Sequence, residues 1–453
     1  MALPATAPSG WVKKCGPALI ASVFLLIFYW RGLNTWFYQD DFGWLHLGPA
    51  KGFVDFLAIL FAPKAHGNIR PWSENLFFYG LHSLFGVNPL PFRIVVFATA
   101  IADTFLLAAL TRRLTGSGLA SGAAPILWLA NACVAPALCW TSIYNETQYL
   151  VFVLLALLLF LEGRYGWQIV VFALGLGSLE TAVMYPAIAL LYAWLYDRAK
   201  LRRTVPLFAI SAAYTLLHFL VAPTAKAGPY AIQIDSRIVH TLGTYVQMVL
   251  GPERLTHFHW LWPAWVTPAG TLLMAAAATV AIIAGGRAGI FGLGWFVLLL
   301  VPVIALPEHI EDYVLTGPAM GLAILLAGAI AARPRIGAVI AALYLAVSLP
   351  AAWDVEAWHY TRSRTSGDLV TSIVAYNREH PGKTLLITGM NTDQFDAGFA
   401  DVPFELYGMH NVYLAPGAER NIHDGRGIAN LYVVPAGKAA GAVVLDVSSG
   451  RAR

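Results

Sequence analysis

The stretch PALIASVFLLIFYWRGLNTWFYQDDF, residues 17–42, decides the fold class of this chain. The run from Pro17 to Trp30 is long and apolar enough to begin a transmembrane helix, and the aromatic residues after it are typical of a membrane–water interface. Two adjacent carboxylates, Asp40 and Asp41, follow these aromatic residues. Holding two acids at such a boundary costs desolvation and mutual repulsion, which favours a functional role over a pair of solvated loop carboxylates.

The composition of the whole chain agrees with a membrane protein of many spans. Of the 453 residues, 58% are hydrophobic and 12% are charged, whereas an ordinary soluble domain carries about 25% charged residues. The formal net charge is +4, and no dense basic run with interleaved aromatic residues indicates a nucleic-acid partner. The three cysteines follow neither a disulfide framework nor the spacing of a zinc site.

Eleven apolar runs are long enough to cross or nearly cross a bilayer. They are residues 17–37, 91–110, 119–140, 148–161, 167–179, 182–196, 205–221, 268–284, 288–306, 314–332 and 336–352. With eleven spans, the basic residues that flank them, such as Lys13, Arg112 and Arg333, fall on one side, as the positive-inside bias requires. We therefore expect an all-α polytopic membrane domain over residues 1–353.

The same topology places the polar residues that are hardest to explain structurally on the opposite, outer face. That face receives the first outer loop, residues 38–90, together with Glu146, Glu180 and a long loop, 222–267, that holds Arg254. The cytoplasmic face carries little beyond basic anchors. We therefore expect any functional site on the outer face.

The first outer loop is itself partly apolar. Phe53–Phe61 and Leu76–Phe85 are amphipathic segments, too short or too polar to span, and we expect them to lie in the plane of the interface. Between them, HGNIRPW at residues 66–72 forms a polar break flanked by aromatic residues.

The chain changes character after its last apolar run. Residues 354–453 are expected to form a small extracytoplasmic α/β domain. A helical pattern near residues 368–379 precedes short β-like runs at 384–388, 411–414, 431–434 and 442–446. No Gly-rich phosphate loop follows any of these runs.

An acidic pair after the first helix, an amphipathic outer loop, many helices and an outward C-terminal domain resemble the GT-C membrane glycosyltransferases. Three stretches narrow the likeness towards the protein O-mannosyltransferase branch. HGNIRP at 66–71 is similar to a His-x-x-x-Arg-Pro segment, SLE at 178–180 to a Ser-Lys-Glu segment, and WTSIYNE at 140–146 to the link entering the fourth helix. The likeness covers residues 15–350 loosely. Leu179 departs from it by replacing the lysine, the acidic pair is Asp-Asp instead of Asp-Glu, and no TPR array follows.

The resemblance implies an inverting glycosyltransferase that moves a hexose or pentose from a polyprenyl-phosphate donor to an acceptor on the outer face. The acceptor, whether glycan, lipid or protein, stays open. Such chemistry needs a base to deprotonate the acceptor, cations for the departing phosphate and a dry site. Asp40 or Asp41 supplies the base, because a neighbouring carboxylate raises the proton affinity of one member of the pair. The choice between them stays open.

Five further residues are candidates for binding the donor or the acceptor. Arg70 is the best donor-phosphate ligand, since a guanidinium gives bidentate contacts to phosphate, although it also suits a lipid headgroup. His66 suits a proton transfer or hydrogen bond to the same groups, or is merely solvated. Glu180 pairs with Arg70, binds the acceptor or serves helix packing, while Glu146 also suits a helix N-terminus. Arg254 contacts the donor phosphate or lines the interface.

Metal dependence also stays open. Asp40 and Asp41, with an outer glutamate, suit Mg²⁺ or Mn²⁺. Some members of the class need a metal, whereas the mannosyltransferase branch does not.

Two other functions compete with sugar transfer. A transporter or lipid flippase would use the acids as proton or cation sites, and Asp103 within the second span supports it. A scaffold without catalysis would explain the loss of the lysine at Leu179, while the retained acidic pair argues against it. The clustering of ionisable groups on one face favours surface chemistry, and the compact tail favours a bacterial inner membrane with the site and the C-terminal domain outside.

Overall fold

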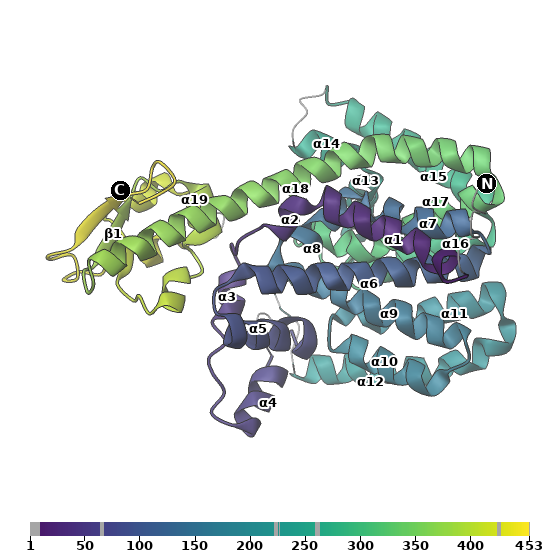
Figure 1. The fold of residues 1–453 in the computed structure, drawn as a ribbon, viewed down its shortest axis with the longest axis horizontal. Helices are drawn as coiled ribbons and strands as arrows, with labels where there is room; N and C mark the ends of the chain where they lie inside the picture. Colours follow the sequence, from purple (N-terminus) through teal and green to yellow (C-terminus); the bar gives the residue numbers. More distant parts are fainter. Residues whose placement is uncertain are drawn as a thin grey trace, which may run out of the picture.

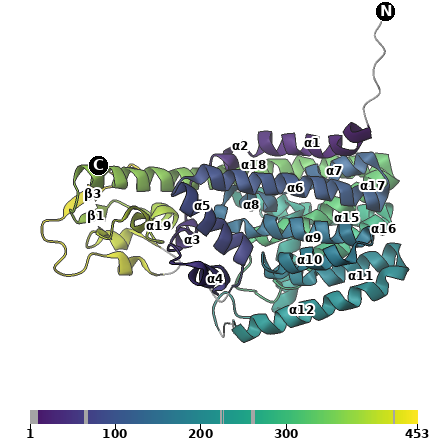
Figure 2. The same ribbon diagram turned by 60° about the horizontal axis from the view of Figure 1, so that its bottom comes forward.

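The chain is described by a computed structural model that covers residues 10–63, 68–221, 225, 227–258, 263–423 and 427–452, with the backbone alone at 10–15, 256 and 258. Most of the long helices lie side by side along one axis and form a bundle (Figure 1). A smaller C-terminal part projects beyond one end of this bundle, at the opposite end from the N-terminus. The turned view in Figure 2 shows the same two parts.

Each of the eleven predicted spans contains a helix. These helices are α1 (Gly10–Phe28), α6 (Pro89–Thr115), α7 (Gly118–Leu129) with α8 (Ala135–Cys139), α9 (Asn145–Leu161), α10 (Tyr165–Leu176), α11 (Tyr185–Tyr196), α12 (Leu201–Val221), α15 (Val266–Gly285), α16 (Arg287–Leu300), α17 (Thr316–Ala332) and α18 (Pro334–Glu379). Six helices in the described part of the chain are long and apolar enough to cross a membrane, and a bent pair, 118–129 with 132–139, makes a seventh. The remaining helices are shorter. The prediction of an all-α, multi-pass membrane architecture is confirmed.

Local sequence signals explain where these helices begin and end. At the start of α6, the side chain of Asn88 accepts a hydrogen bond from the backbone N–H of Leu90, and proline follows in the first turn. At its end, Gly116 adopts φ 69°, and its N–H closes on the Arg112 carbonyl at 2.8 Å. Such a left-handed residue after a helix favours glycine, so α6 stops at the residue before it.

The first predicted span is broken. Helix α1 ends at Phe28, and a single turn, α2 (Trp30–Leu33), follows before the chain leaves the helical path. Asn34 closes this turn through its backbone N–H on the Arg31 carbonyl at 2.8 Å. The span predicted to reach residue 37 therefore ends earlier, and the aromatic residues up to the acidic pair form a separate loop.

Basic links gather at one end of the bundle. Arg113, after α6, donates a hydrogen bond to Glu162, after α9, at 3.1 Å. Lys200, before α12, donates to the Leu161 carbonyl at 2.7 Å. These contacts join the links that follow α6, α9 and α11 at one end, as the charge pattern predicted.

Helix α17 lies at the centre of the bundle, with every residue from Thr316 to Ile330 buried. Helix α16 approaches it through two glycines. A Cβ atom at Gly292 would collide with the Gly321 carbonyl oxygen, and a Cβ atom at Gly321 would collide with the Gly292 carbonyl oxygen. Small residues allow two backbones to approach this closely, which is how helices pack in an apolar solvent.

The opposite end of the bundle carries the segments that were predicted to be outer, and they are called outer for that reason. In the first outer loop lie α3 (Asp41–Leu45), α4 (Phe53–Phe61), a π-helix η2 (Pro71–Leu76) and α5 (Phe77–Phe85). Helix α4 has its predicted bounds, and α5 begins one residue after the predicted segment because the π-helix runs to Leu76. Figure 1 shows α3, α4 and α5 together at this end.

The long loop predicted at residues 222–267 is partly helical instead. It contains α13 (Arg237–Leu250) and α14 (Pro252–Phe258). Helix α13 buries Thr241, Tyr245, Met248 and Val249, which follow the spacing of one helical face. That spacing is visible in the sequence, but the polar residues of α13 make it too polar to be predicted as a membrane span.

The C-terminal part contains a small parallel sheet of order β2-β1-β3, from β1 (Leu385–Thr388), β2 (Val412–Leu414) and β3 (Val443–Asp446). These strands fall within three of the four predicted β-like runs. The fourth run forms a 3-10 turn, η10 (Ala429–Tyr432), followed by an isolated bridge between Leu414 and Val433. The helix predicted near 368–379 is the end of α18, which continues through the domain boundary predicted at residues 353 and 354.

Candidate functional site

A cavity of about 710 Å³ opens at the end of the bundle that carries the outer segments. Its walls come from the loop after α2, the π-helix η2, the start of α9, the 3-10 turn η5 (Glu180–Met184), the end of α12 and the segment between α16 and α17. One part of the lining is polar and contains Asp40, Asn68, Arg70, Glu74, Ser142, Asn145, Glu146, Glu180, Thr181, Tyr214, Thr215, His218, Tyr230, His309 and Tyr313. Another part is apolar and contains Val183, Met184, Phe219, Val301, Pro302, Val303 and Leu306.

The two adjacent acids of the first loop have different surroundings. Asp40 lines the cavity, whereas the Asp41 side chain is fully buried. Oδ1 of Asp41 accepts hydrogen bonds from the Ser142 N–H at 2.7 Å and from the Ser142 hydroxyl at 2.5 Å, and Oδ2 accepts from the Tyr38 N–H at 3.1 Å. Burial raises the pKa of Asp41 to about 7, although the bonds from Ser142 and Tyr38 act to lower it. Asp41 therefore ties the loop to the bundle, and Asp40 is the member of the pair that reaches the cavity.

Arg70 lies between two carboxylates in the cavity wall. Its Nε donates to Oε2 of Glu180 at 2.8 Å, its Nη2 lies 2.8 Å from the same oxygen, and its Nη1 donates to Oε1 of Glu74 at 2.5 Å. Burial lowers the pKa of Arg70, but the carboxylates of Glu180 and Glu74 outweigh this effect and hold the pKa above its ordinary value. The expected pairing of Arg70 with Glu180 is present, and the guanidinium has further N–H donors for a ligand.

Glu74 is a cavity residue that the sequence analysis missed. It lies four residues after Arg70 in the π-helix, and Oε1 also accepts a hydrogen bond from the Asn145 side chain at 3.2 Å. Burial raises the pKa of Glu74, opposed by the charge of Arg70. The spacing of an acid four residues after a base was the available signal. Tyr313 and His309, from the segment before α17, also line the cavity and were not among the predicted site residues.

Glu146 lies in the first turn of α9 and lines the cavity with 5% of its surface exposed. A carboxylate in the first turn is stabilised by the helix dipole, which agrees with the structural alternative for this residue. Among the described residues, no group donates a hydrogen bond to its carboxylate. Glu146 is therefore buried, open to the cavity and available to a ligand.

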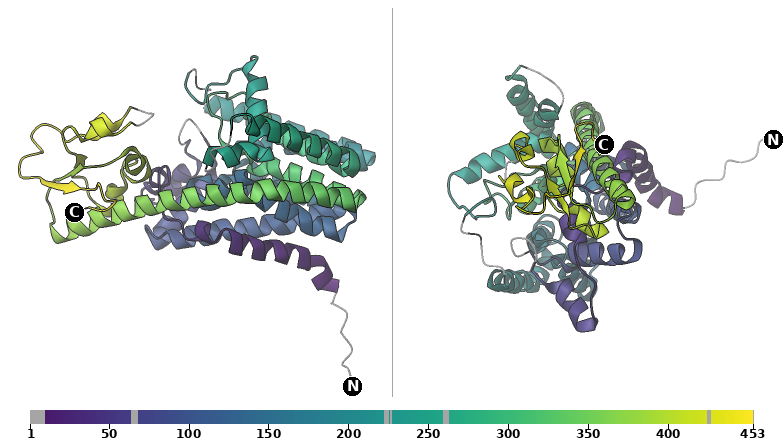
Figure 3. Two further views of the ribbon diagram at one scale, coloured as in Figure 1. Left: turned by 90° about the horizontal axis from the view of Figure 1, so that it is seen from above. Right: turned by 90° about the vertical axis from the view of Figure 1, so that its left-hand side faces the viewer.

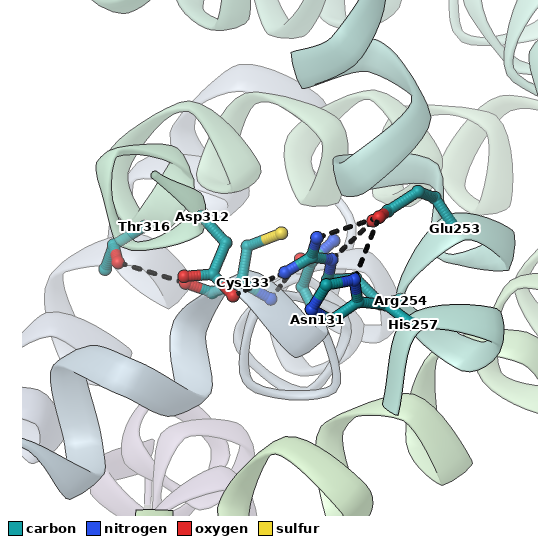
Figure 4. A network of polar contacts seen from close by, with 7 residues as sticks. All are labelled: Asn131, Cys133, Glu253, Arg254, His257, Asp312 and Thr316. Carbon is teal, nitrogen blue, oxygen red and sulfur yellow. Dashed lines mark hydrogen bonds and ion pairs between the residues drawn. The ribbon is translucent and has the colours of Figure 1, made fainter. Parts of the chain in front are cut away.

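Arg254 lies in a different cluster, outside the lining of this cavity. Its Nε and Nη2 donate to Glu253 at 2.5 and 2.9 Å, and its Nη1 donates to Asp312 at 2.9 Å. Figure 4 shows this network beside Asn131 and Cys133, which belong to the bent link between α7 and α8. Arg254 thus joins α14 to η7 (Asp312–Leu315), the turn that brings Tyr313 to the cavity.

The other predicted site features are His66 and a metal ion held by the acidic pair. His66 lies outside the described residues. Within the described ranges, no group of three or more His, Cys, Asp and Glu side chains is arranged to hold a metal ion. Both oxygens of Asp41 are engaged by Tyr38 and Ser142, so the acidic pair does not present two free carboxylates to one Mg²⁺ or Mn²⁺ ion.

Comparisons with known proteins give one structural likeness. No protein-family model matches the chain, and no curated protein matches it. Among solved structures, the chain is similar to ArnT from Cupriavidus metallidurans bound to undecaprenyl phosphate, with 14% sequence identity and a TM-score of 0.48. The alignment covers 98% of this chain and 91% of that chain. A likeness of this size carries no argument about what this chain binds or does.

Proposed function

We propose that this chain is an integral-membrane glycosyltransferase that moves a sugar from a polyprenyl-phosphate donor to an acceptor in the cavity lined by Asp40, Arg70 and Glu146. One observation carries the proposal: a single cavity of about 710 Å³ joins carboxylates, a guanidinium and an apolar wall at one end of a helix bundle. A lipid-linked sugar has matching parts, because it combines a hydroxyl-rich ring, a phosphate and a long apolar chain.

The apolar wall supports a lipid-linked donor. Phe219, at the end of α12, lines the cavity together with Val301 and Val303, which follow α16. Leu216 and Leu220, on the same helix as Phe219, are 63% and 73% exposed, as expected of a face that meets lipid. In this proposal the donor's chain lies along α12, with its phosphate at Arg70.

Asp40 acts as the base in this scheme. It takes the proton from an acceptor hydroxyl, whose oxygen attacks the anomeric carbon from the face opposite the phosphate. The bond between the anomeric carbon and the phosphate oxygen breaks, and its electron pair leaves with the phosphate, so the anomeric centre inverts. Asp41 holds the loop through Ser142 and does not touch the substrates.

Arg70 stabilises the departing phosphate through N–H groups that its two carboxylate partners leave unused. Glu74 and Glu180 fix the plane of the guanidinium, so little side-chain freedom is lost when the phosphate binds. Because two carboxylates face one guanidinium, the cluster offers a phosphate no net charge attraction, and phosphate binding depends on directed hydrogen bonds from the remaining N–H groups. Glu146 orients the acceptor through its open carboxylate.

We place the reaction on the outer face of a bacterial inner membrane. The basic links lie at the far end of the bundle, which the positive-inside bias assigns to the cytoplasm. The identity of the sugar and of the acceptor is left to experiment.

One observation favours a second candidate function, a transporter or flippase. Asp103 lies within α6, is fully buried, and has two carboxylate oxygens without a hydrogen-bond partner among the described residues. An unpaired acid inside a spanning helix is a frequent mark of a proton or cation path.

The test is sugar transfer by the purified protein in lipid nanodiscs. Radiolabelled polyprenyl-phosphate sugars are offered with membrane extract as acceptor, and wild type is compared with Asp40→Asn. We expect transfer by the wild type and a loss of about 10³-fold in the variant, since a general base contributes about 10²–10⁴-fold. Asp55→Asn, a change in α4 of the same outer loop, serves as the matched control and should keep wild-type transfer.

Two outcomes would contradict the proposed function. Transfer that survives Asp40→Asn, or a donor panel that is not consumed by folded wild type, rejects the proposed enzyme. Proton-coupled flux in proteoliposomes that is lost in Asp103→Asn would then support the transporter.

A further inference from the structure

Two non-glycine residues in the described part of the chain have left-handed backbone conformations, Gln39 with φ 52° and Val402 with φ 48°. This region is unfavourable for residues with a Cβ atom, and a β-branched residue such as valine is a pronounced outlier there. Such a conformation persists only where the surrounding structure enforces it. The two residues are far apart in the sequence, yet they lie on the two sides of one contact between the acidic loop and the C-terminal domain.

The contact is made of backbone and side-chain hydrogen bonds. The N–H of Gln39 donates to the Ala397 carbonyl in α19 (Thr392–Gly398) at 2.9 Å. Nε of Arg362 donates to Oε1 of Gln39 at 3.2 Å. Nε2 of His46, just after α3, donates to the Val402 carbonyl at 3.2 Å. The segment that contains Asp40 is therefore held by the C-terminal domain at both of its ends.

The region of α18 that enters the C-terminal domain adds two contacts to the same loop. Nδ1 of His359 lies 2.6 Å from the hydroxyl of Tyr38, in a buried hydrogen bond. Gly367 lies against the ring of Trp36, where an added Cβ atom would be 3.4 Å from the ring. These contacts extend the attachment to the residues that precede the acidic pair. In Figure 2, α3 lies between the bundle and α19.

The C-terminal domain is a firm support for this contact. Helix α18 runs without interruption over 46 residues from the bundle into the domain, as Figure 3 shows. Helix α19 packs closely on it, because a Cβ atom at Gly398 would lie 2.9 Å from Oγ of Ser366. A domain on a continuous helix holds its position relative to the bundle better than one on a flexible linker.

Three successive residues of the loop contact three different parts of the molecule. Gln39 bonds to the C-terminal domain, Asp40 lines the cavity, and Asp41 bonds to Ser142 of the bundle. Gln39, the first of these three residues, has the left-handed backbone conformation. A relaxed backbone at Gln39 would redirect Asp40 as well.

We propose that the C-terminal domain clamps the loop of Asp40 and thereby positions that carboxylate in the cavity. The catalytic part of this inference rests on the proposed function. Gln39 and Arg362 are positioning residues, since neither lines the cavity and both act through their neighbour Asp40.

The test combines hydrogen exchange with kinetics on the full-length protein in nanodiscs. The variants are Gln39→Ala, Arg362→Ala and the double change, and the exchange of the backbone amides in the peptide covering residues 36–46 is measured. Arg364→Ala is the matched control, because Arg364 lies on the same helix, is exposed, and has a long 4.0 Å contact to Asp368. Arg362→Lys is the conservative variant, since an ammonium can also donate to Oε1 of Gln39.

We expect the amides of the loop to exchange about tenfold faster in either single variant, as loss of a local hydrogen bond permits local opening. The kcat of sugar transfer should fall about tenfold with KM for the donor unchanged, because the base is displaced while the donor site is intact. The double variant should be no worse than Arg362→Ala alone, since the hydrogen-bond partner of the Gln39 side chain is Arg362, whereas Arg362 also contacts Asp393 in α19 at 3.3 Å. Arg362→Lys should recover part of the kcat, and Arg364→Ala should match wild type.

The two measurements separate the inference from the proposed function. Unchanged exchange in Arg362→Ala and Gln39→Ala rejects the clamp, whatever the activity. Faster exchange with unchanged kcat rejects the positioning of the base by the domain. If folded wild type transfers no sugar, the proposed function fails, and the exchange data still decide whether the domain holds the loop.

Discussion

Arg70 and Arg254 occupy two ion clusters of the same kind, and only one of them lines the candidate site. Each guanidinium lies between two carboxylates, one close in the sequence and one from a distant element. For Arg70 these are Glu74 and Glu180, and for Arg254 they are Glu253 and Asp312. The shortest contacts are 2.5 Å in both clusters.

The clusters differ in what lies beside them. Arg70 lines the large cavity together with both of its partners, whereas Arg254 is 6% exposed and lies in a packed network that joins α14, η7 and the bent link after α7. A buried arginine between carboxylates is therefore not by itself a sign of a functional site. The opening of the cluster towards a ligand-sized space is the distinguishing feature.

Among the variants that test this comparison, the largest expected effect is the loss of sugar transfer in Arg70→Ala. Removal of a donor that stabilises departing charge lowers kcat by about 10²–10³-fold. Steady-state transfer in nanodiscs measures this effect, with thermal unfolding of the same sample as the control for folding. Activity within about threefold of wild type in a folded variant would remove the distinction between the two clusters.

Arg254→Ala should affect stability instead of chemistry. It leaves two carboxylates that are only 21% and 14% exposed without their cation, and breaking such a cluster costs about 3 kcal/mol of unfolding free energy. Denaturant unfolding in mixed micelles checks the loss, while transfer per folded molecule should stay within about threefold of wild type. A selective loss of transfer with unchanged stability would place Arg254 in the catalytic site and contradict our assignment.

Asp41 is a buried acid outside both clusters, and it sharpens the comparison because its hydrogen-bond partners are neutral. Its pKa is about 7 in the folded protein and about 3.9 in an unfolded chain. Between these values the folded state binds a proton that the unfolded state does not, so the unfolding free energy falls as pH rises from about 4 to about 7. The contribution is up to about 1.4 kcal/mol per pH unit.

Asp41→Asn should remove this part of the pH dependence. The amide keeps an acceptor for Ser142 but places a donor near the Tyr38 N–H, so the variant is less stable than wild type at acid pH and has a flatter profile. Thermal unfolding midpoints from pH 5 to pH 8 for both proteins test the slope. Parallel profiles would mean that Asp41 does not titrate in this range.

The smallest effect is expected at an exposed ion pair. Arg113 and Glu162 lie at the basic end of the bundle, with 56% and 39% of their side-chain surfaces exposed. Solvent screens such a pair, so Arg113→Ala should change the unfolding free energy by less than about 0.5 kcal/mol and leave transfer unchanged. If Arg113→Ala lowered the unfolding free energy as much as Arg254→Ala, burial would not explain the difference in stability between exposed and buried ion pairs.

The helices were readable from the sequence because their backbone hydrogen bonds are local. In an apolar solvent each spanning segment must satisfy its own backbone groups, so apolar runs predict helices and their order. The amphipathic helix Phe53–Phe61 and the strands β1, β2 and β3 also follow from local patterns. By contrast, α13 carries a helical pattern too polar to be found as a span, and the continuity of α18 through residue 353 depends on the domain it supports.

The sequence by itself determined that this is a helical, multi-pass membrane protein with an acidic pair after its first span. It also marked Arg70, Glu146 and Glu180 as residues that need an explanation. Only the tertiary structure decided that these three meet Asp40 in one cavity, that Glu74 joins them, and that Arg254 does not. The physical reason is that contacts between side chains on different helices depend on how whole helices pack, and no local pattern encodes that arrangement. Adjacent residues can then have different roles: Asp40 lines the cavity, while Asp41 is buried against Ser142.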